Sequence, residues 1–152
     1  MTENEIATPS AKDLIERLAL QPHPEGGWYR ETWRAEAAEG ERASATAIHF
    51  LLEEGQASHW HTVDATEIWL WHAGNPLKLS LADPTGTRSA AVRLGPDIAG
   101  GDVVQQVIRP GEWQAATPFP GEHGYTLVSC IVSPAFEFSG FTLAPPDWQP
   151  GE

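Results

Sequence analysis

The chain has 152 residues, of which 41% are hydrophobic and 20% are charged, and its formal net charge is −12. This composition is typical of one globular domain, expected at residues 10–148 with short tails at 1–9 and 149–152, and it excludes a disordered chain. The nine Lys and Arg residues form no basic run. Because nucleic acids and anionic membranes bind to positive surfaces, we expect neither as a partner.

A short helix is the first predicted element. Ser10 and Asp13 resemble a capping box, in which each side chain bonds the backbone N–H group of the other. Leu14, Ile15 and Leu18 then form a narrow apolar stripe, as in an amphipathic helix. A proline soon after them ends the helix.

The rest of the chain is predicted to form short strands. Fourteen Gly and thirteen Pro residues are scattered between brief apolar runs, which indicates many turns. Such spacing is typical of an all-β sandwich or barrel. The runs are rich in branched or aromatic residues and lie at 28–33, 44–52, 67–72, 77–81, 88–94, 103–108, 125–132 and 138–143.

The chain has a single cysteine, Cys130, which therefore forms no disulfide within the chain. It lies in the apolar run 127–132, so we expect a small core residue. No apolar leader and no stretch of about 20 apolar residues is present. These features predict a cytoplasmic protein.

The side chains most suited to chemistry are His59, His61 and Glu67. If residues 59–61 are extended, the two imidazoles point to the same face, and a turn at 64–66 lets Glu67 return to that face. Two imidazoles and a carboxylate form a set that suits a divalent Fe, Mn, Ni or Zn ion. The alternative is a hydrogen-bonded cluster of buried polar groups without a metal.

The segment 55–74 reads Gly, three residues, His-x-His, five residues, Glu, six residues, Gly. This pattern resembles the first motif of the cupin superfamily, although three or four residues usually separate the second His from the Glu. Pro110 to Gln114 resembles the second motif, with Gln114 in place of the fourth ligand, a His. The resemblance implies a double-stranded β-helix, the cupin jelly roll, with a metal held by His59, His61, Glu67 and Gln114.

More narrowly, residues 14–143 resemble the cupin-5 domain family, which has no assigned reaction. That resemblance implies a homodimer. Thr62 and Leu70 depart from the family, which usually has Arg and His at these places. By strand alternation, Leu70 faces away from Glu67, so its replacement affects the other side of the sheet.

Four further side chains are candidates for a substrate pocket. Trp71 and Trp113 could form an aromatic wall, and Tyr125 could donate a phenolic proton. Gln114 could hydrogen-bond a substrate instead of binding a metal. His23, in a loop rich in Pro and Gly, is expected at the surface, and the stretch 24–32 that follows it is expected near a dimer edge.

Three functions are open for a protein whose partner is a small polar molecule, and the first is favoured because two imidazoles and a carboxylate are costly to bury without a cation. The first is a metal-dependent enzyme with isomerase, lyase or dioxygenase chemistry, in which His61 and Glu67 are the catalytic residues. The second is a metal-free enzyme resembling sugar epimerases, with His61 paired to Asp64 or Glu67. The third is a carbohydrate-binding protein without catalysis.

Overall fold

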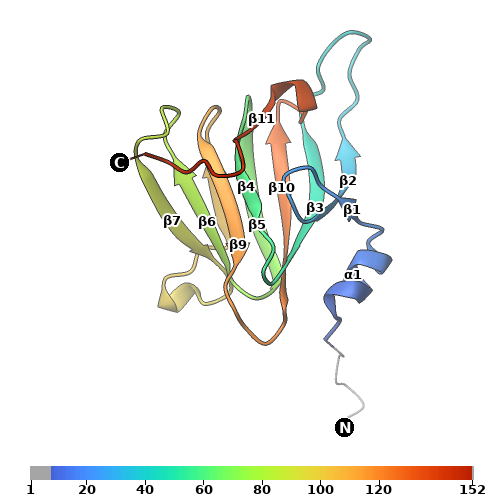
Figure 1. The fold of residues 1–152 in the computed structure, drawn as a ribbon. Coiled ribbons are helices and arrows are strands. Elements are labelled where there is room, and N and C mark those ends of the chain that lie inside the picture. The colour runs from blue at the N-terminus through green and yellow to red at the C-terminus, as the bar shows by residue number, and fades with distance from the viewer. Residues whose placement is uncertain (1–7, 152) are drawn as a thin grey trace.

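A computed structural model describes residues 8–151 as two antiparallel sheets that face each other (Figure 1). The six-stranded sheet has the order β1-β2-β3-β10-β5-β8, and the five-stranded sheet has the order β11-β4-β9-β6-β7. The predicted all-β class is confirmed. Of the predicted tails, residues 1–7 and 152 lie outside the described residues.

The elements follow the chain in this order: α1 (Ala11–Arg17), β1 (Gln21–Pro22), β2 (Trp28–Arg34), β3 (Thr46–Glu53), β4 (Ser58–Val63), β5 (Thr66–Gly74), β6 (Leu77–Ala82), β7 (Ser89–Leu94), η1 (Ile98–Gly100), β8 (Gln105–Ile108), β9 (Trp113–Pro118), β10 (Tyr125–Ser133), η2 (Phe138–Gly140) and β11 (Phe141–Leu143). The run predicted at 138–143 is a strand only in its second half, because a 3-10 turn precedes β11. Within residues 8–151, no helix has the length and apolar character needed to cross a membrane.

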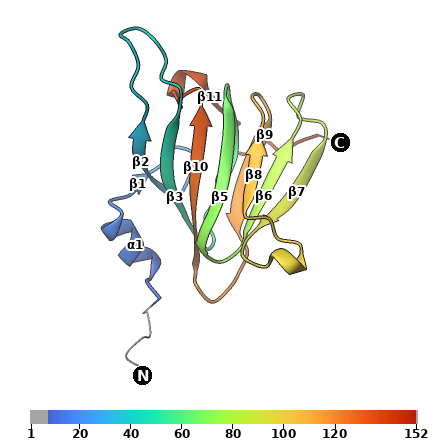
Figure 2. The same cartoon turned by 180° about the vertical axis from the view of Figure 1, so that it is seen from behind.

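The predicted helix begins as expected. Ser10 Oγ accepts a hydrogen bond from the N–H of Asp13 at 3.1 Å, and Asp13 Oδ2 accepts one from the N–H of Ser10 at 3.2 Å. The apolar side of α1 packs with Leu51 of β3 and Tyr125 of β10. Figure 2 shows the helix beside the edge of the six-stranded sheet that carries β1 and β2.

The space between the sheets is divided along its length. Trp69 on β5 and Val128 on β10 belong to a buried apolar cluster. Towards the other end of the same strands, Glu67 and Val132 line a cavity. Cys130 lies between these regions and is buried, as predicted. Along these strands, the side chains of the inward face therefore line the apolar core at one end and the cavity at the other.

The two glycines that bound the 55–74 motif differ in their surroundings. Gly55 and Gly74 have φ of 91° and 89°, but a Cβ at Gly74 would lie 2.2 Å from the carbonyl oxygen of Tyr125, whereas nothing lies within 4 Å at Gly55. Both positions impose strain of about 1–2 kcal/mol on an alanine, and the clash adds about 1–3 kcal/mol at Gly74. In urea denaturation, Gly74→Ala is expected to lose clearly more stability than Gly55→Ala. Equal losses would show that the close approach to Tyr125 is unimportant.

Candidate functional site

A cavity of about 330 Å³ opens between the two sheets. Its wall combines ionisable, polar and aromatic side chains from both sheets and from the turns beside them, which is typical of a small-molecule site. The lining residues are Gln21, His23, Glu25, Tyr29, Glu31, Arg34, Thr46, Ile48, His61, Val63, Glu67, Cys130, Val132, Phe136 and Phe138. Of the sequence-predicted site residues, His61 and Glu67 are in this set.

A bulge in β4 separates the two histidines of the motif. Between the pairs Ser58–Ala116 and His61–Gln114, strand β4 has one residue more than β9. Such an extra residue disrupts strict alternation. Ser58 and His61 are buried, whereas His59 Nε2 lies 2.8 Å from the carbonyl oxygen of Pro145. The prediction that His59 and His61 share one face is therefore wrong.

A hydrogen bond and burial together determine the tautomer and the protonation state of His61. Its Nδ1 lies 2.8 Å from the carbonyl oxygen of His59, which can only accept, so Nδ1 carries the hydrogen. Burial lowers the pKa of His61, so the ring is neutral and its lone pair is on Nε2. That nitrogen lies 3.2 Å from Glu25 Oε2. Nε2 of His61 can therefore accept a hydrogen bond from a protonated carboxyl of Glu25.

Glu25 is the main functional candidate that sequence reasoning missed. Its side chain is buried, Oε1 accepts a hydrogen bond from Ser58 Oγ at 2.7 Å, and its backbone carbonyl accepts one from the N–H of His59 at 2.9 Å. Burial raises the pKa of Glu25 to about 8, so it holds a proton at neutral pH. The available signal was Gly26, where a Cβ would lie 2.0 Å from the carbonyl oxygen of Ala57. Only glycine allows this turn to approach β4 so closely.

Glu67 lies at the start of β5, where a chain of hydrogen bonds supports it. Trp69 Nε1 donates to Gln114 Oε1 at 2.8 Å, and Gln114 Nε2 donates to Glu67 Oε1 at 2.9 Å. An indole N–H can only donate, so it determines which way the amide of Gln114 points. Burial raises the pKa of Glu67 to about 7, with a further contribution from Glu25. Glu67 therefore exchanges its proton near neutral pH.

His23 was expected at the surface, but its side chain is only 5% exposed and lines the cavity. Its Nδ1 accepts a hydrogen bond from the N–H of Glu25 at 3.1 Å, and its ring centroid is 4.5 Å from that of Tyr29. Burial lowers the pKa of His23 to about 4, so its imidazole is neutral. The surface prediction was wrong because the turn folds back over the opening between the sheets.

Three residues predicted for the pocket lie elsewhere. Trp71 packs against the core and donates from Nε1 to the carbonyl oxygen of Asn75 at 3.1 Å. Trp113 packs against Trp148, with ring centroids 4.4 Å apart and ring planes inclined by 34°. Tyr125 is buried near α1. Strand alternation and the curvature of the sheets direct these large rings to the core or to the outer surfaces, so they do not line the cavity.

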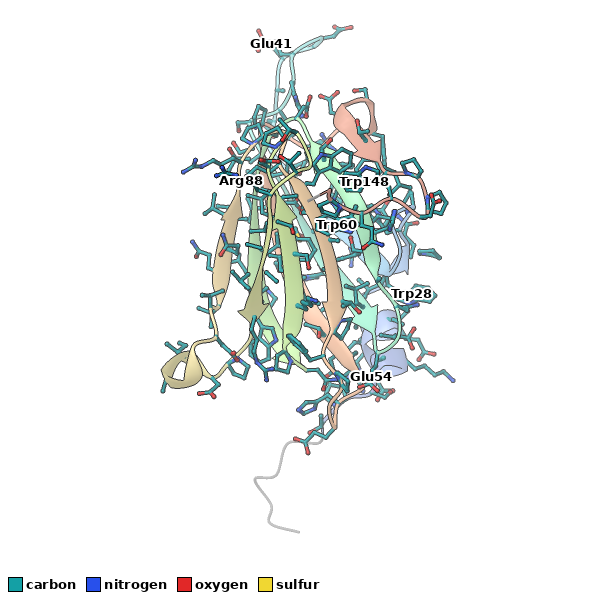
Figure 3. The ribbon with its side chains drawn as sticks, turned by 60° about the vertical axis from the view of Figure 1, so that its left-hand side comes forward. Trp28, Glu41, Glu54, Trp60, Arg88 and Trp148 are labelled. Atoms are coloured by element: carbon teal, nitrogen blue, oxygen red, sulfur yellow. The ribbon has the colours of Figure 1, made fainter. Side chains whose placement is uncertain are left out.

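His59 and two tryptophans lie on the outer surface of the five-stranded sheet. The C-terminal segment crosses this surface (Figure 1), with hydrogen bonds from the N–H of Ala144 to the carbonyl of Trp60 and from Gly151 to Gly86. Figure 3 shows Trp60 and Trp148 close together there, and their ring centroids are 5.9 Å apart. His59 thus belongs to the contact between this segment and the sheet.

The four predicted metal ligands do not form one site. His59 is bonded on the outer surface, and the amide oxygen of Gln114 already accepts from Trp69. Only His61 and Glu67 of that set face the cavity. Across residues 8–151, no group of three or more His, Cys, Asp or Glu side chains is arranged to hold a metal ion. The predicted set of His59, His61, Glu67 and Gln114 therefore does not fit the divalent metal that the motif implies.

Comparisons with known proteins agree with the fold. The family model Cupin_5, described as Cupin superfamily (DUF985), matches residues 12–144. A hypothetical protein from Leishmania major is 32% identical, with a TM-score of 0.81, 90% of this chain and 88% of that chain covered. Protein SO0799 from Shewanella oneidensis is 36% identical, with a TM-score of 0.82 and coverage of 90% and 85%.

A more distant likeness extends to oxalate decarboxylase from Lactobacillus farciminis, solved as a formate complex. It is 15% identical, with a TM-score of 0.59, over 82% of this chain and 33% of that chain. This similarity shows the shared jelly-roll fold alone. No curated protein matches the chain.

Proposed function

Because the chain belongs to the Cupin_5 family of the cupin superfamily, we propose that it is a small-molecule enzyme that transfers protons in its cavity without a metal ion. The observation that carries the proposal is the convergence of Glu25, His61 and Glu67, all buried, on one cavity. Isomerases and epimerases need such a pairing, because one group removes a proton while another supplies one.

The two carboxyl groups differ in a way that suits these two roles. The pKa is about 8 for Glu25 and about 7 for Glu67. Between pH 7 and pH 8, Glu25 therefore still holds its proton while Glu67 has begun to lose its own. Two titratable groups with separated pKa values are typical of an acid and a base in one active site. Because they interact, the observed pKa values belong to the pair.

The proposed step acts on a carbonyl compound with an adjacent C–H bond. The Glu67 carboxylate takes the proton from that carbon, and the protonated carboxyl of Glu25 donates its proton to the carbonyl oxygen. The C–H bond breaks, an O–H bond forms and an enol results. Protonated Glu67 then gives a proton back to carbon, while the Glu25 carboxylate takes a proton from an enol hydroxyl group, which restores both residues and completes an isomerisation or epimerisation. His61 and Ser58 hold Glu25 in place: in the resting state Nε2 of His61 accepts a hydrogen bond from the protonated carboxyl of Glu25, and Ser58 Oγ donates one to its other oxygen.

Deuterium exchange tests this function without knowledge of the product. Candidate carbonyl compounds are incubated with the protein in D2O, and NMR follows deuterium at the carbon next to the carbonyl group. We expect His61→Gln to lose exchange by a factor of about 10² or more, because the variant lacks the imidazole nitrogen that positions the general acid Glu25. Its matched control is His59→Gln, which keeps exchange because His59 faces the outer surface.

Equal losses in these two variants, with circular dichroism showing both folded, would overturn the assignment of His61. Treatment with EDTA is expected to leave exchange unchanged. If exchange needs added Fe, Mn, Ni or Zn, the metal-dependent alternative is correct and the proposal fails.

The homodimer implied by the family remains a proposal, supported by an apolar row on the outer face of the six-stranded sheet. The row runs through paired positions on five strands, and its first and last members are 54% and 46% exposed. Exposed apolar side chains in a continuous group are typical of protein interfaces. The row comprises Trp33, Ala47, Ile131, Ile68 and Val107.

A further inference from the structure

The mouth of the cavity carries an ion pair that the proposed step does not use. Arg34 Nη2 lies 2.7 Å from Glu31 Oε1, and Arg34 Nε lies 3.3 Å from Glu31 Oε2. A third bond joins Arg34 Nη2 to the carbonyl oxygen of Phe136 at 3.0 Å. Both charged side chains come from β2, line the cavity and are partly exposed, at 43% for Arg34 and 38% for Glu31. An entering molecule can therefore contact this pair.

The pair leaves no free positive charge for an acid. Among the described residues that line the cavity, Arg34 is the only Lys or Arg. A carboxylate or phosphate group would have to displace Glu31 from the guanidinium and remain beside its negative charge. Like charges at such distances repel each other, and partial burial reduces the screening by water. An anionic substrate is thus disfavoured at the mouth.

Neutral hydroxyl groups have no such conflict. A hydroxyl can accept a hydrogen bond from a guanidinium and can donate one to a carboxylate. Two neighbouring hydroxyls can therefore bond Arg34 and Glu31 at the same time, without breaking the ion pair. Hydrogen bonds to charged groups are stronger than those between neutral groups, so this contact favours a molecule that carries vicinal hydroxyls.

The remaining wall of the mouth is aromatic. Phe136, Phe138 and Tyr29 line the cavity, and Phe138 is 52% exposed. Aromatic faces pack against the C–H groups of a ring whose hydroxyls point sideways. The volume of about 330 Å³ is near the lower end of the range for ligand pockets, so the occupant is small.

Resting on the proposed function of the same cavity, we infer that the substrate is a neutral, polyhydroxylated carbonyl compound of monosaccharide size, and that the Glu31–Arg34 pair selects it over acids. The carbonyl end would reach Glu25 and Glu67, and the vicinal hydroxyls would lie at the mouth. Glu31 and Arg34 are then residues that determine specificity and take no part in proton transfer.

Calorimetric titration of the full chain with matched pairs of sugars tests this inference. Glucose and glucuronate, and galactose and galacturonate, differ mainly by a carboxylate in place of a CH2OH group. We expect each neutral sugar to bind at least about ten-fold more tightly than its acid, which corresponds to about 1.4 kcal/mol. In Glu31→Gln, Arg34 becomes free to pair with the carboxylate, so the preference is expected to fall or reverse.

The control is Glu41→Gln, which changes the net charge equally. Glu41 is exposed, and Figure 3 shows it at the far tip of the loop between β2 and β3. This variant is expected to keep the preference of the unchanged protein. If Glu31→Gln and Glu41→Gln behave alike, if the acids bind as tightly as the neutral sugars, or if no neutral sugar binds, the inference is overturned.

Binding and proton transfer are read separately. Neutral sugars that bind without deuterium exchange would support the substrate class and contradict the proposed function. Exchange on acids, with no preference for neutral sugars, would support the proposed function and overturn the substrate class.

Discussion

Replacing Glu67 by Gln is expected to lower the rate of proton exchange by a factor of about 10² to 10⁴, the usual contribution of a general base. The fold should survive, because the new amide oxygen can accept the hydrogen bond that Gln114 Nε2 donates to Glu67 Oε1 at 2.9 Å. The variant thus removes the base and keeps the supporting chain of Trp69 and Gln114. Deuterium exchange gives the rate, and thermal unfolding confirms that the protein is folded.

The pH profile provides the control for this variant. In the unchanged protein, exchange is expected to rise as the pH passes about 7, where Glu67 loses its proton, and to fall above about 8, where Glu25 loses its own. Glu67→Gln should lack the rising limb. A variant with a full rate and both limbs would show that another group is the base.

Replacing Glu25 by Gln is expected to stabilise the protein at alkaline pH. Burial raises the pKa of Glu25 from 4.5 to about 8, so the folded state holds a proton that the unfolded state has lost in this range. The free energy of unfolding therefore falls as the pH rises from about 4.5 to about 8, by about 1.4 kcal/mol per pH unit for this group, and then levels off. The variant avoids a loss of about 5 kcal/mol, because an amide does not ionise.

The amide also preserves the local contacts. Its oxygen can accept from Ser58 Oγ, as Glu25 Oε1 does at 2.7 Å, and its NH2 group can donate to His61 Nε2. Urea denaturation at pH 6 and pH 9 measures the difference in the free energy of unfolding between the variant and the unchanged protein. His23 is present in both proteins, so its contribution to that free energy cancels in the difference. The difference should grow with pH for Glu25→Gln and stay near zero for the exposed Glu41→Gln. A constant difference would mean that Glu25 is not buried as a neutral acid.

Local sequence patterns determined much of the fold. The capping residues Ser10 and Asp13 start α1 as predicted, because a cap depends on atoms only three residues apart. Along β5, alternation correctly placed Glu67 and Trp69 inside and Leu70 outside. The spacing of His61 and Glu67 also identified two of the residues that line the cavity.

Tertiary structure decided the composition of the site. Alternation describes a strand only while its ladder is regular, and the bulge in β4 depends on the pairing of that strand with β9. It moved His59 to the outer surface and left His61 inside. Glu25 and His23 lie in the site because the turn that carries them, distant in sequence from β4, packs against that strand. No local pattern encodes that contact. The sequence by itself thus specified most of the strands and, where the ladder is regular, the faces that they bury. The proposed acid–base pair arises only where separate segments meet in a buried space, because burial is what shifts the pKa values of its carboxyl groups.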